Sequence, residues 1–297
     1  MNIAHDGSGM KAIGVDALQE GDILLMMGDG PLSDLIAWAS DGVYSHAGIV
    51  VDGGELVEAS LGGVRRYPLA RRATEHAHFH FIDAWRPQGP DARPFAAAEL
   101  VLVCDRAGEM LGAPYPVDQL ALFGAIMAVR GKWPLQPLLR KLVRIALDHA
   151  VPSTSPAMVC SEVVYRAWAE CAVDPRGRLA PPIVEGERGT APFPDIDWKR
   201  LAAEIGPLLF PGAAGDRLRT GAPDGGRLME TGDVPTDEAL DQARQRVLTH
   251  LDAPGLLRTG GQAERLAHRP NPRLVSPQDL ANSPGTRLLG RLMGGGV

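Results

Sequence analysis

The sequence has few cysteines, and this scarcity excludes a fold held together by disulfides. Three occur among 297 residues, Cys104, Cys160 and Cys171. An odd and sparse set of this kind is typical of a protein in a reducing compartment. The segment from Met1 to Glu20 lacks the apolar run that a secretory signal needs. No stretch reaches the roughly 18 consecutive apolar residues of a membrane-spanning helix, so we predict a cytoplasmic location.

The chain also lacks the positive charge of a general nucleic-acid binder. Its net charge is −6, whereas such a protein needs a basic face to displace counterions from the phosphate backbone. Neither a glycine-rich phosphate loop nor an array of basic and aromatic residues occurs, so we predict no nucleic-acid partner. The apolar fraction of 45% supports a sizeable core, and the length allows one large domain or two ordinary ones.

The most informative stretch is a predicted β-hairpin. Two alternating, β-branched runs flank the turn sequence Asp52-Gly53-Gly54, and glycine supplies the positive φ that such a turn requires. With a three-residue loop, Val51 pairs with Glu55 and Gly48 with Glu58. Glu58 then lies diagonally on the same face as His46, roughly 7–8 Å away at Cα.

Two alternatives remain open for this hairpin. A two-residue loop would place Glu58 on the opposite face, because a slip of one residue reverses every side chain, and Ser60 would then be the fallback partner of His46. His46 and Glu58 could also be two solvated residues on a half-exposed hairpin. If they do meet, a glutamate beside an imidazole fixes its tautomer and favours its protonated form.

A second stretch, around Cys160, predicts a helix. Apolar residues recur at helical spacing at positions 159, 163, 164, 167, 168 and 171. The helix begins either at a Ser155 cap with Pro156 in the first turn, or at Cys160 itself. Only the later start places the sulfur in the first turn, where the helix dipole favours a thiolate. Otherwise, Cys160 is a small buried apolar residue on a helix face.

Together these motifs resemble a known family. The blocks Gly21–Leu25, Tyr44–Val50, Val57–Ala59 with Gly63–Arg66, and Val159–Val164 resemble the YiiX-like branch of the NlpC-type superfamily. These proteins are circularly permuted papain-like cysteine hydrolases, and lecithin retinol acyltransferase is similar to them. In this branch the histidine strand precedes the cysteine helix, as it does here. Ser276–Pro284 resembles the segment that closes the domain.

The resemblance implies an α+β fold in which an antiparallel sheet packs against helices and the cysteine stands at a helix N-terminus. It implies Cys160 as nucleophile, His46 as base and Glu58 as the group that orients the base. Candidate substrate-binding residues are Tyr115 on a rigid turn, Tyr44 within the histidine motif, and Arg65 at the hairpin exit. It implies no metal and no organic cofactor.

The remaining segments complete a predicted domain plan. We expect residues 1–180, completed by 271–297, to form the catalytic domain, and the proline- and glycine-rich 181–270 to be an elaboration with helices near 197–209 and 236–251. Further helices are predicted over 31–40 and 95–111 and a first strand over 22–27. His76, His78 and His80 alternate and would share a strand face, but no ligand spacing for zinc is recognisable.

Residues 117–149 form the most apolar part of the chain. A stripe of apolar residues at helical spacing faces a basic surface, at Leu135, Leu138, Leu139, Leu142, Val143 and Ala146. Such a helix can pack against the core, or it can contact a membrane surface peripherally through 132–149 or cover an acyl-chain pocket.

The sequence therefore predicts a thiol hydrolase of amide, peptide or related acyl bonds that works through a covalent acyl-enzyme. One alternative is a lipid acyl hydrolase or acyltransferase. The other is a catalytically silent module that binds a lipid or a peptide in the same cleft. In each case the partner is a small molecule, a peptide or an acyl lipid.

Overall fold

The computed structural model describes residues 10–60, 62–75, 77–115, 119–149, 157–184, 191–209, 234–250 and 270–293. Among the predicted features, Ser155, Pro156, His76 and most of 210–269 lie outside these ranges. The strands are β1 (Ile23–Gly28), β2 (His46–Val51), β3 (Glu55–Ser60), β4 (Gly63–Pro68), β5 (Phe79–Pro87) and β6 (Thr286–Met293). The helices are α1 (Pro31–Ala39), α2 (Leu69–Arg72), α3 (Ala97–Glu109), α4 (Gln119–Val129), α5 (Pro137–His149), α6 (Cys160–Glu170), α7 (Trp198–Leu209), α9 (Asp237–His250) and α11 (Pro277–Asn282).

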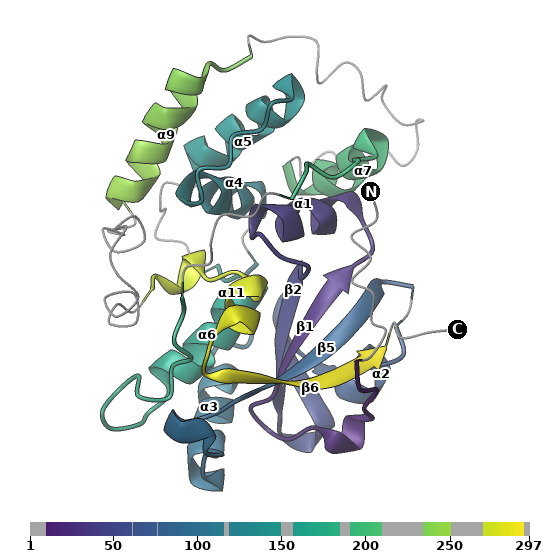
Figure 1. Ribbon diagram of the computed structural model, residues 1–297, viewed down its shortest axis with the longest axis vertical. Coiled ribbons are helices and arrows are strands. Elements are labelled where there is room, and N and C mark those ends of the chain that lie inside the picture. The colour runs from purple at the N-terminus through teal and green to yellow at the C-terminus, as the bar shows by residue number, and fades with distance from the viewer. Residues whose placement is uncertain are drawn as a thin grey trace.

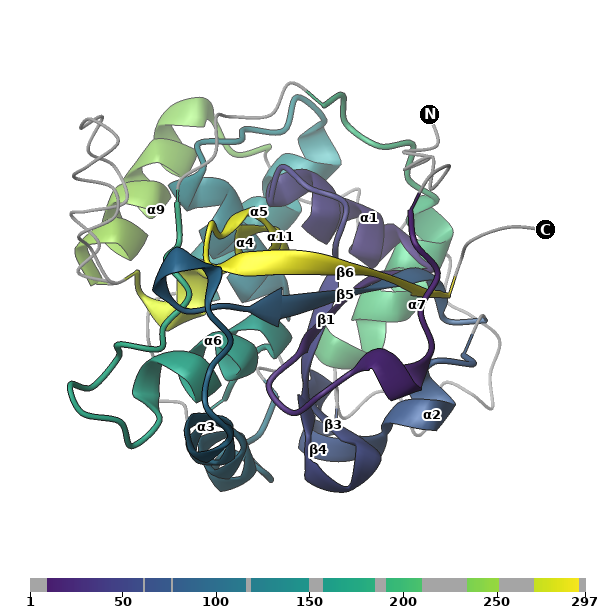
Figure 2. The ribbon, with the colours of Figure 1, turned by 60° about the horizontal axis from the view of Figure 1, so that its bottom comes forward.

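The strands form one antiparallel sheet in the order β4-β3-β2-β1-β5-β6. The α+β class predicted from the sequence is confirmed. β6 comes from the C-terminal part of the chain and lies beside β5 at one edge of the sheet (Figures 1 and 2). A strand that begins 226 residues after the end of the hairpin thus belongs to the same sheet as the hairpin.

The turn between β2 and β3 has the predicted three-residue loop. Gly53 and Gly54 adopt φ values of 73° and 71°, which residues with a Cβ rarely adopt. Val51 pairs with Glu55 and Gly48 with Glu58, as predicted. The described ladder between the two strands ends at the pair of Gly48 with Glu58, two residues after His46. The two strands therefore separate just where His46 stands.

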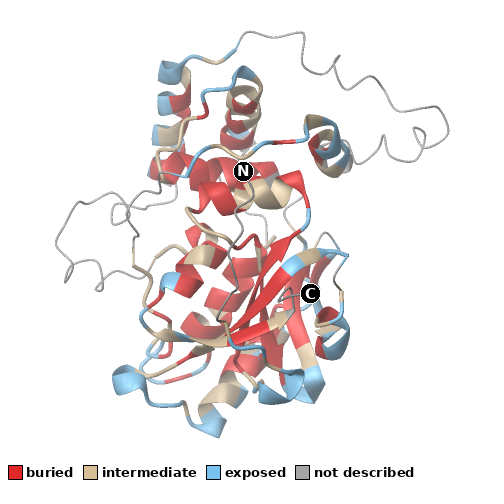
Figure 3. Ribbon diagram, turned by 45° about the vertical axis from the view of Figure 1, so that its right-hand side comes forward, coloured by how far each residue is buried: buried red, intermediate tan, exposed pale blue. Residues whose placement is uncertain are grey.

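Both faces of the sheet are covered, which explains why β1 is buried along its whole length. On one face, alternate β1 residues such as Ile23 and Leu25 pack with Trp168 of α6 and with α3. On the other face, Leu24 and Met26 pack with Leu69 of α2. Figure 3 shows the buried residues concentrated in the sheet and in the helix faces turned toward it. Burial on both sides fixes which face each strand residue occupies.

A second core lies among the helices that gather at one end of the sheet (Figure 1). On the apolar face of α5, Leu139 and Val143 are fully buried among α4 and α9, whereas Leu138 and Leu142 are only partly buried. Of the alternatives for this helix, packing against neighbouring helices is the one observed. Leu135 is not part of the buried stripe, because it precedes α5 and is 95% exposed. No helix among the described residues is long and apolar enough to cross a membrane.

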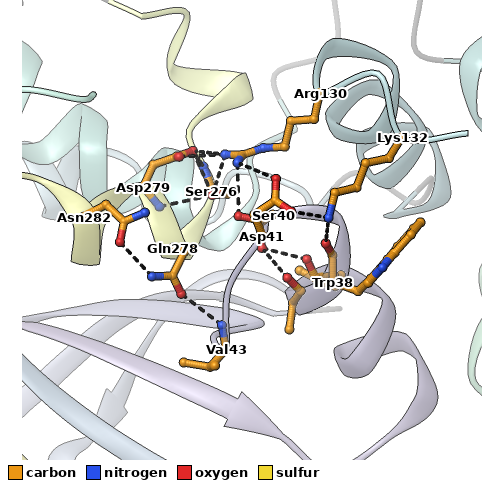
Figure 4. Close-up of polar contacts among 12 residues, drawn as sticks. Trp38, Ser40, Asp41, Val43, Arg130, Lys132, Ser276, Gln278, Asp279 and Asn282 are labelled. Atoms are coloured by element: carbon orange, nitrogen blue, oxygen red, sulfur yellow. Dashed lines mark hydrogen bonds and ion pairs between the residues drawn. The ribbon is translucent and has the colours of Figure 1, made fainter. Parts of the chain in front are cut away.

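An ion-pair network connects the helical layer to the sheet domain (Figure 4). Arg130, which follows α4, donates from Nη2 to both carboxylate oxygens of Asp279 in α11, at 2.6 and 2.8 Å. Lys132 pairs with Asp41 in the turn after α1. Because Asp279 and Asp41 are largely buried, each carboxylate depends on its cation to offset lost hydration.

The same network reaches the start of the histidine strand. The side-chain oxygen of Gln278 in α11 accepts a hydrogen bond of 2.9 Å from the N–H of Val43, three residues before His46. The short helix α11 thus helps to fix the chain that enters β2. The C-terminal segment of the protein therefore supports the candidate site as well as the sheet.

We expect replacement of Asp279 by alanine to lower the free energy of unfolding by about 3 kcal/mol or more, because it removes the buried carboxylate that pairs with Arg130 and accepts the capping bonds of Ser276 at the start of α11. Asp148 in α5 provides a matched control, since its side chain is 40% exposed and its partners Arg144 and Arg246 lie at the surface. Asp148→Ala should cost less than about 1 kcal/mol. Urea unfolding of the full chain measures both, and equal losses would contradict the role assigned to the network.

Candidate active site

His46 and Glu58 contact each other directly at the separated ends of β2 and β3. His46 Nε2 donates to Glu58 Oε2 at 3.0 Å. The Glu58 side chain is completely buried, and 19% of the His46 side chain is exposed. The prediction that Glu58 shares a sheet face with His46 and approaches its ring is confirmed, because the three-residue loop fixes that register. With Nε2 engaged, Nδ1 is the ring nitrogen available to a further partner.

Cys160 is the first residue of α6. Val159 before it is extended, with φ −94° and ψ 166°, so the helix begins at the cysteine and not at Ser155. The sulfur thus lies in the first helical turn, as the later of the two predicted starts requires. The residue is only 7% exposed.

The surroundings of Cys160 favour its charged form. Burial raises the pKa of the thiol, but the charge of His46 and a hydrogen bond with its imidazole outweigh burial and lower the pKa below its ordinary value of 9.0. The backbone N–H groups of Ala47 and Ser161 lower the pKa of the thiol further.

The three side chains form a continuous chain of opposite charges. Burial disfavours the charged imidazole, yet the thiolate of Cys160 and the carboxylate of Glu58 together raise the pKa of His46 to about 9. Burial likewise disfavours a charged Glu58, but His46, Arg72 and Arg65 lower the pKa of its carboxyl to about 2. The mutual effects favour a thiolate, an imidazolium and a carboxylate in sequence.

The other two cysteines lie in different surroundings. Burial raises the pKa of Cys104 to about 11 and also raises that of Cys171. Cys171 directly follows α6, and its thiol donates to the carbonyl of Trp168. Cys104 is 6% exposed, almost the same as Cys160. Exposure therefore does not distinguish Cys104 from Cys160, whereas the neighbouring imidazole does.

The candidate substrate-binding residues occupy different positions. Tyr44 is buried, and its hydroxyl donates to Asp83 at 2.9 Å. The guanidinium of Arg65 bonds to Glu58, although 46% of the side chain is exposed. Tyr115 follows Pro114, whose carbonyl accepts from the N–H of Met158, two residues before Cys160. Tyr115 thus belongs to the segment beside the cysteine, and the binding role of all three residues stays a prediction.

Sequence reasoning missed two arginines near the site, one that bonds to Glu58 and one that pairs with Asp83, the acceptor of the Tyr44 hydroxyl. Arg72 in α2 bonds to Glu58. Arg291 in β6 makes a two-pronged ion pair with Asp83, at 2.6 and 3.0 Å, on the carboxylate that receives the Tyr44 hydroxyl. No local signal pointed to Arg72, which is 14 residues from Glu58 in the sequence. None existed for Arg291, which is 208 residues from its partner.

The alternating histidines do not line one strand face as predicted. β5 begins at Phe79, so His78 precedes the strand and only His80 lies within it. His80 Nε2 is 3.5 Å from Asp29 Oδ1. Within the ranges that the structure describes, no group of three or more His, Cys, Asp or Glu side chains is arranged to hold a metal ion.

Comparison with known proteins gives little beyond the structure itself. No protein-family model matches the sequence, and no curated protein matches it significantly. Among solved structures, the chain is similar to the metalloprotein yiiX from Escherichia coli, at 17% sequence identity and a TM-score of 0.39, over 92% of this chain and 97% of that chain. At this identity and TM-score, the similarity carries no argument about the activity of the present chain.

Proposed function

We propose that the protein is a cysteine-dependent hydrolase on a circularly permuted papain-like fold, with Cys160, His46 and Glu58 as its catalytic residues. The observation that supports this best is a cysteine at a helix start whose pKa is lowered by an imidazole that bonds at Nε2 to a buried carboxylate. A lowered thiol pKa beside a histidine is the usual environment of a reactive cysteine. The permuted topology is supported by the order in which the histidine strand precedes the cysteine helix.

The proposed reaction has two halves. The Cys160 thiolate attacks the carbonyl carbon of an amide or related acyl bond, and the His46 imidazolium gives its proton to the leaving amine or alcohol. The backbone N–H of Cys160 at the helix start is the candidate donor to the developing oxyanion. His46, now neutral, then takes a proton from water, which attacks the thioester and releases the acid. Glu58 keeps the ring oriented throughout, as the third group does in other triads.

The substrate class is the less constrained part of the proposal. An amide or peptide bond is our first choice, and cleavage of a lipid ester or acyl transfer is the alternative. The lipid alternative was suggested by the apolar 117–149 segment, but its helices bury their apolar faces against one another. The segment therefore gives no separate support to an acyl-lipid substrate. The reaction as proposed uses only side chains and water, and we retain the sequence-based prediction of a cytoplasmic location.

Mass spectrometry of the intact protein tests the proposal. After exposure to panels of activated acyl esters, short peptides and acyl lipids, the chain is expected to gain the mass of one acyl group, and digestion should place it on Cys160. The class of compound that leaves an adduct identifies the substrate class. Cys160→Ala should abolish the adduct and Cys171→Ala should leave it unchanged. If no compound in the panel leaves an adduct, or if the adduct persists in Cys160→Ala, the silent binding module is favoured.

A further inference from the structure

We propose that Arg72 is a positioning residue that holds Glu58, and through it His46, in the orientation that keeps Cys160 reactive. This inference rests on the proposed function, because the reactive group is the Cys160 thiolate. Arg72 lies in α2, across the sheet from the helix that carries Cys160. Its effect on the sulfur is therefore indirect.

The two oxygens of the Glu58 carboxylate have separate partners. Oε2 bonds to His46. Oε1 accepts from Arg72 Nη2 and from Arg65, whose Nε and Nη2 lie at 3.2 and 2.9 Å. Because the guanidinium groups occupy Oε1, the carboxylate can turn away from the imidazole only by breaking charge-assisted hydrogen bonds. The arginines thus fix which oxygen faces His46.

Arg72 is itself held rigidly. Its Nη1 donates to Glu75 Oε2 at 2.5 Å, and only 6% of its side chain is exposed. Its guanidinium carbon lies 4.3 Å from the ring centre of Tyr67 and 4.9 Å from that of Phe79. One planar group therefore bridges two carboxylates and contacts two aromatic rings, an arrangement that a lysine cannot reproduce.

The contact with Phe79 gives Arg72 a second connection to the histidine. The rings of Phe79 and His46 are stacked, with centroids 6.1 Å apart and planes inclined by 27°. The imidazole is thus supported at its Nε2 edge by Glu58 and at its side by Phe79. Arg72 contacts both supports.

Charge balance explains why a buried cation is needed at this place. Seven ionisable groups form the set when the site is charged: the cations His46, Arg65, Arg72 and Arg71, the last of them 71% exposed, and the anions Cys160, Glu58 and Glu75. Glu58 is completely buried and would be costly to keep ionised alone. Arg65 bonds to the same oxygen but is 46% exposed, so water weakens its contribution. Arg72 is the largely buried partner of the pair.

The rate of Cys160 alkylation by iodoacetamide, measured from pH 4 to pH 11 in the full-length protein, tests this proposal. In Arg72→Met the midpoint of the pH profile should rise by about one pH unit or more, because a displaced imidazolium no longer stabilises the thiolate. The limiting rate at high pH should stay within about twofold of the wild-type rate, since a thiolate formed at high pH reacts similarly in both. A purely structural role would not move the midpoint.

Arg65→Met is the matched control, since it removes a guanidinium from the same oxygen at a more exposed position. Its midpoint should move by less than about half a pH unit. Arg72→Lys keeps the charge without the planar fork and should lie between Arg72→Met and the wild type, which also provides a test if Arg72→Met does not fold. Thermal melting of each variant verifies folding.

The outcomes separate this proposal from the proposed function. If the midpoint of Cys160 alkylation in the wild type lies below that of an ordinary thiol and both Arg72 variants have the same midpoint, the positioning role of Arg72 is wrong. The proposal of a reactive cysteine is then unaffected. Equal shifts in Arg72→Met and Arg65→Met would also overturn the specific role of Arg72. If the wild-type midpoint already lies at that of an ordinary buried thiol, the proposed function fails and the role of Arg72 fails with it.

Discussion

Replacement of His46 by alanine is expected to slow alkylation of Cys160 at pH 7 by about a hundredfold, because a nearby opposite charge lowers a thiol pKa by about 1–3 units. Without the imidazolium, the largest of the effects that oppose burial is lost and the pKa of the thiol rises. The helix start and the N–H groups of Ala47 and Ser161 remain, so some activation should persist. Labelling with iodoacetamide, quenched at a series of times and followed by peptide mass spectrometry, measures the rate.

Two further variants show whether this loss is specific. Glu58→Gln keeps the imidazole but removes the charge that orients it, so alkylation should slow less than in His46→Ala. His80→Ala removes a histidine whose side chain is 54% exposed and lies near Asp29 instead of a cysteine, and it should leave the rate unchanged. If His46→Ala leaves alkylation of Cys160 at the wild-type rate, the imidazole does not activate the sulfur.

The hairpin and the cysteine helix could be predicted because their signals are local. The sequence Asp52-Gly53-Gly54 permits the turn that sets the register, and one register places Glu58 on the face of His46. The apolar spacing after Val159 likewise predicts α6. Its exact start was ambiguous in sequence, because a proline and a serine at 155–156 offered an equally plausible cap.

The surroundings of the site could not be predicted, because they depend on contacts between distant segments. Arg291 reaches Asp83 from 208 positions away, and no local pattern reports such a pair. α2 spans only Leu69–Arg72, too short for helical periodicity to show. Arg65 is predicted as a substrate-binding residue, because the sequence shows its charge and its place after the hairpin but not that its guanidinium bonds to Glu58.

The amphipathic helix over 137–149 illustrates a different limit. The spacing predicts its apolar stripe apart from Leu135, which lies outside the helix, but a stripe indicates only that some other element covers it. In the structure α4 and α9 cover it, and α9 belongs to the segment interpreted as an elaboration. The identity of the covering element follows from topology, which the spacing of apolar residues does not contain.

The three cysteines of the native protein offer the most direct test of the central claim, that Cys160 is held as a reactive thiolate. The comparison is favourable because Cys104 and Cys160 are 6% and 7% exposed, so access alone predicts similar rates. Their surroundings shift the thiol pKa in opposite directions: the pKa of Cys104 is raised to about 11, and that of Cys160 is lowered.

Limited labelling of the folded wild-type protein with iodoacetamide at pH 7, followed by quantification of the three cysteine peptides from one digest, is the measurement. Cys160 should be alkylated at least about a hundredfold faster than Cys104 and Cys171, because the thiolate is the attacking species and its population falls tenfold per pH unit below the pKa. Equal rates for Cys160 and Cys104 would mean that the sulfur is packed as an ordinary buried side chain, and the hydrolase proposal would then be wrong.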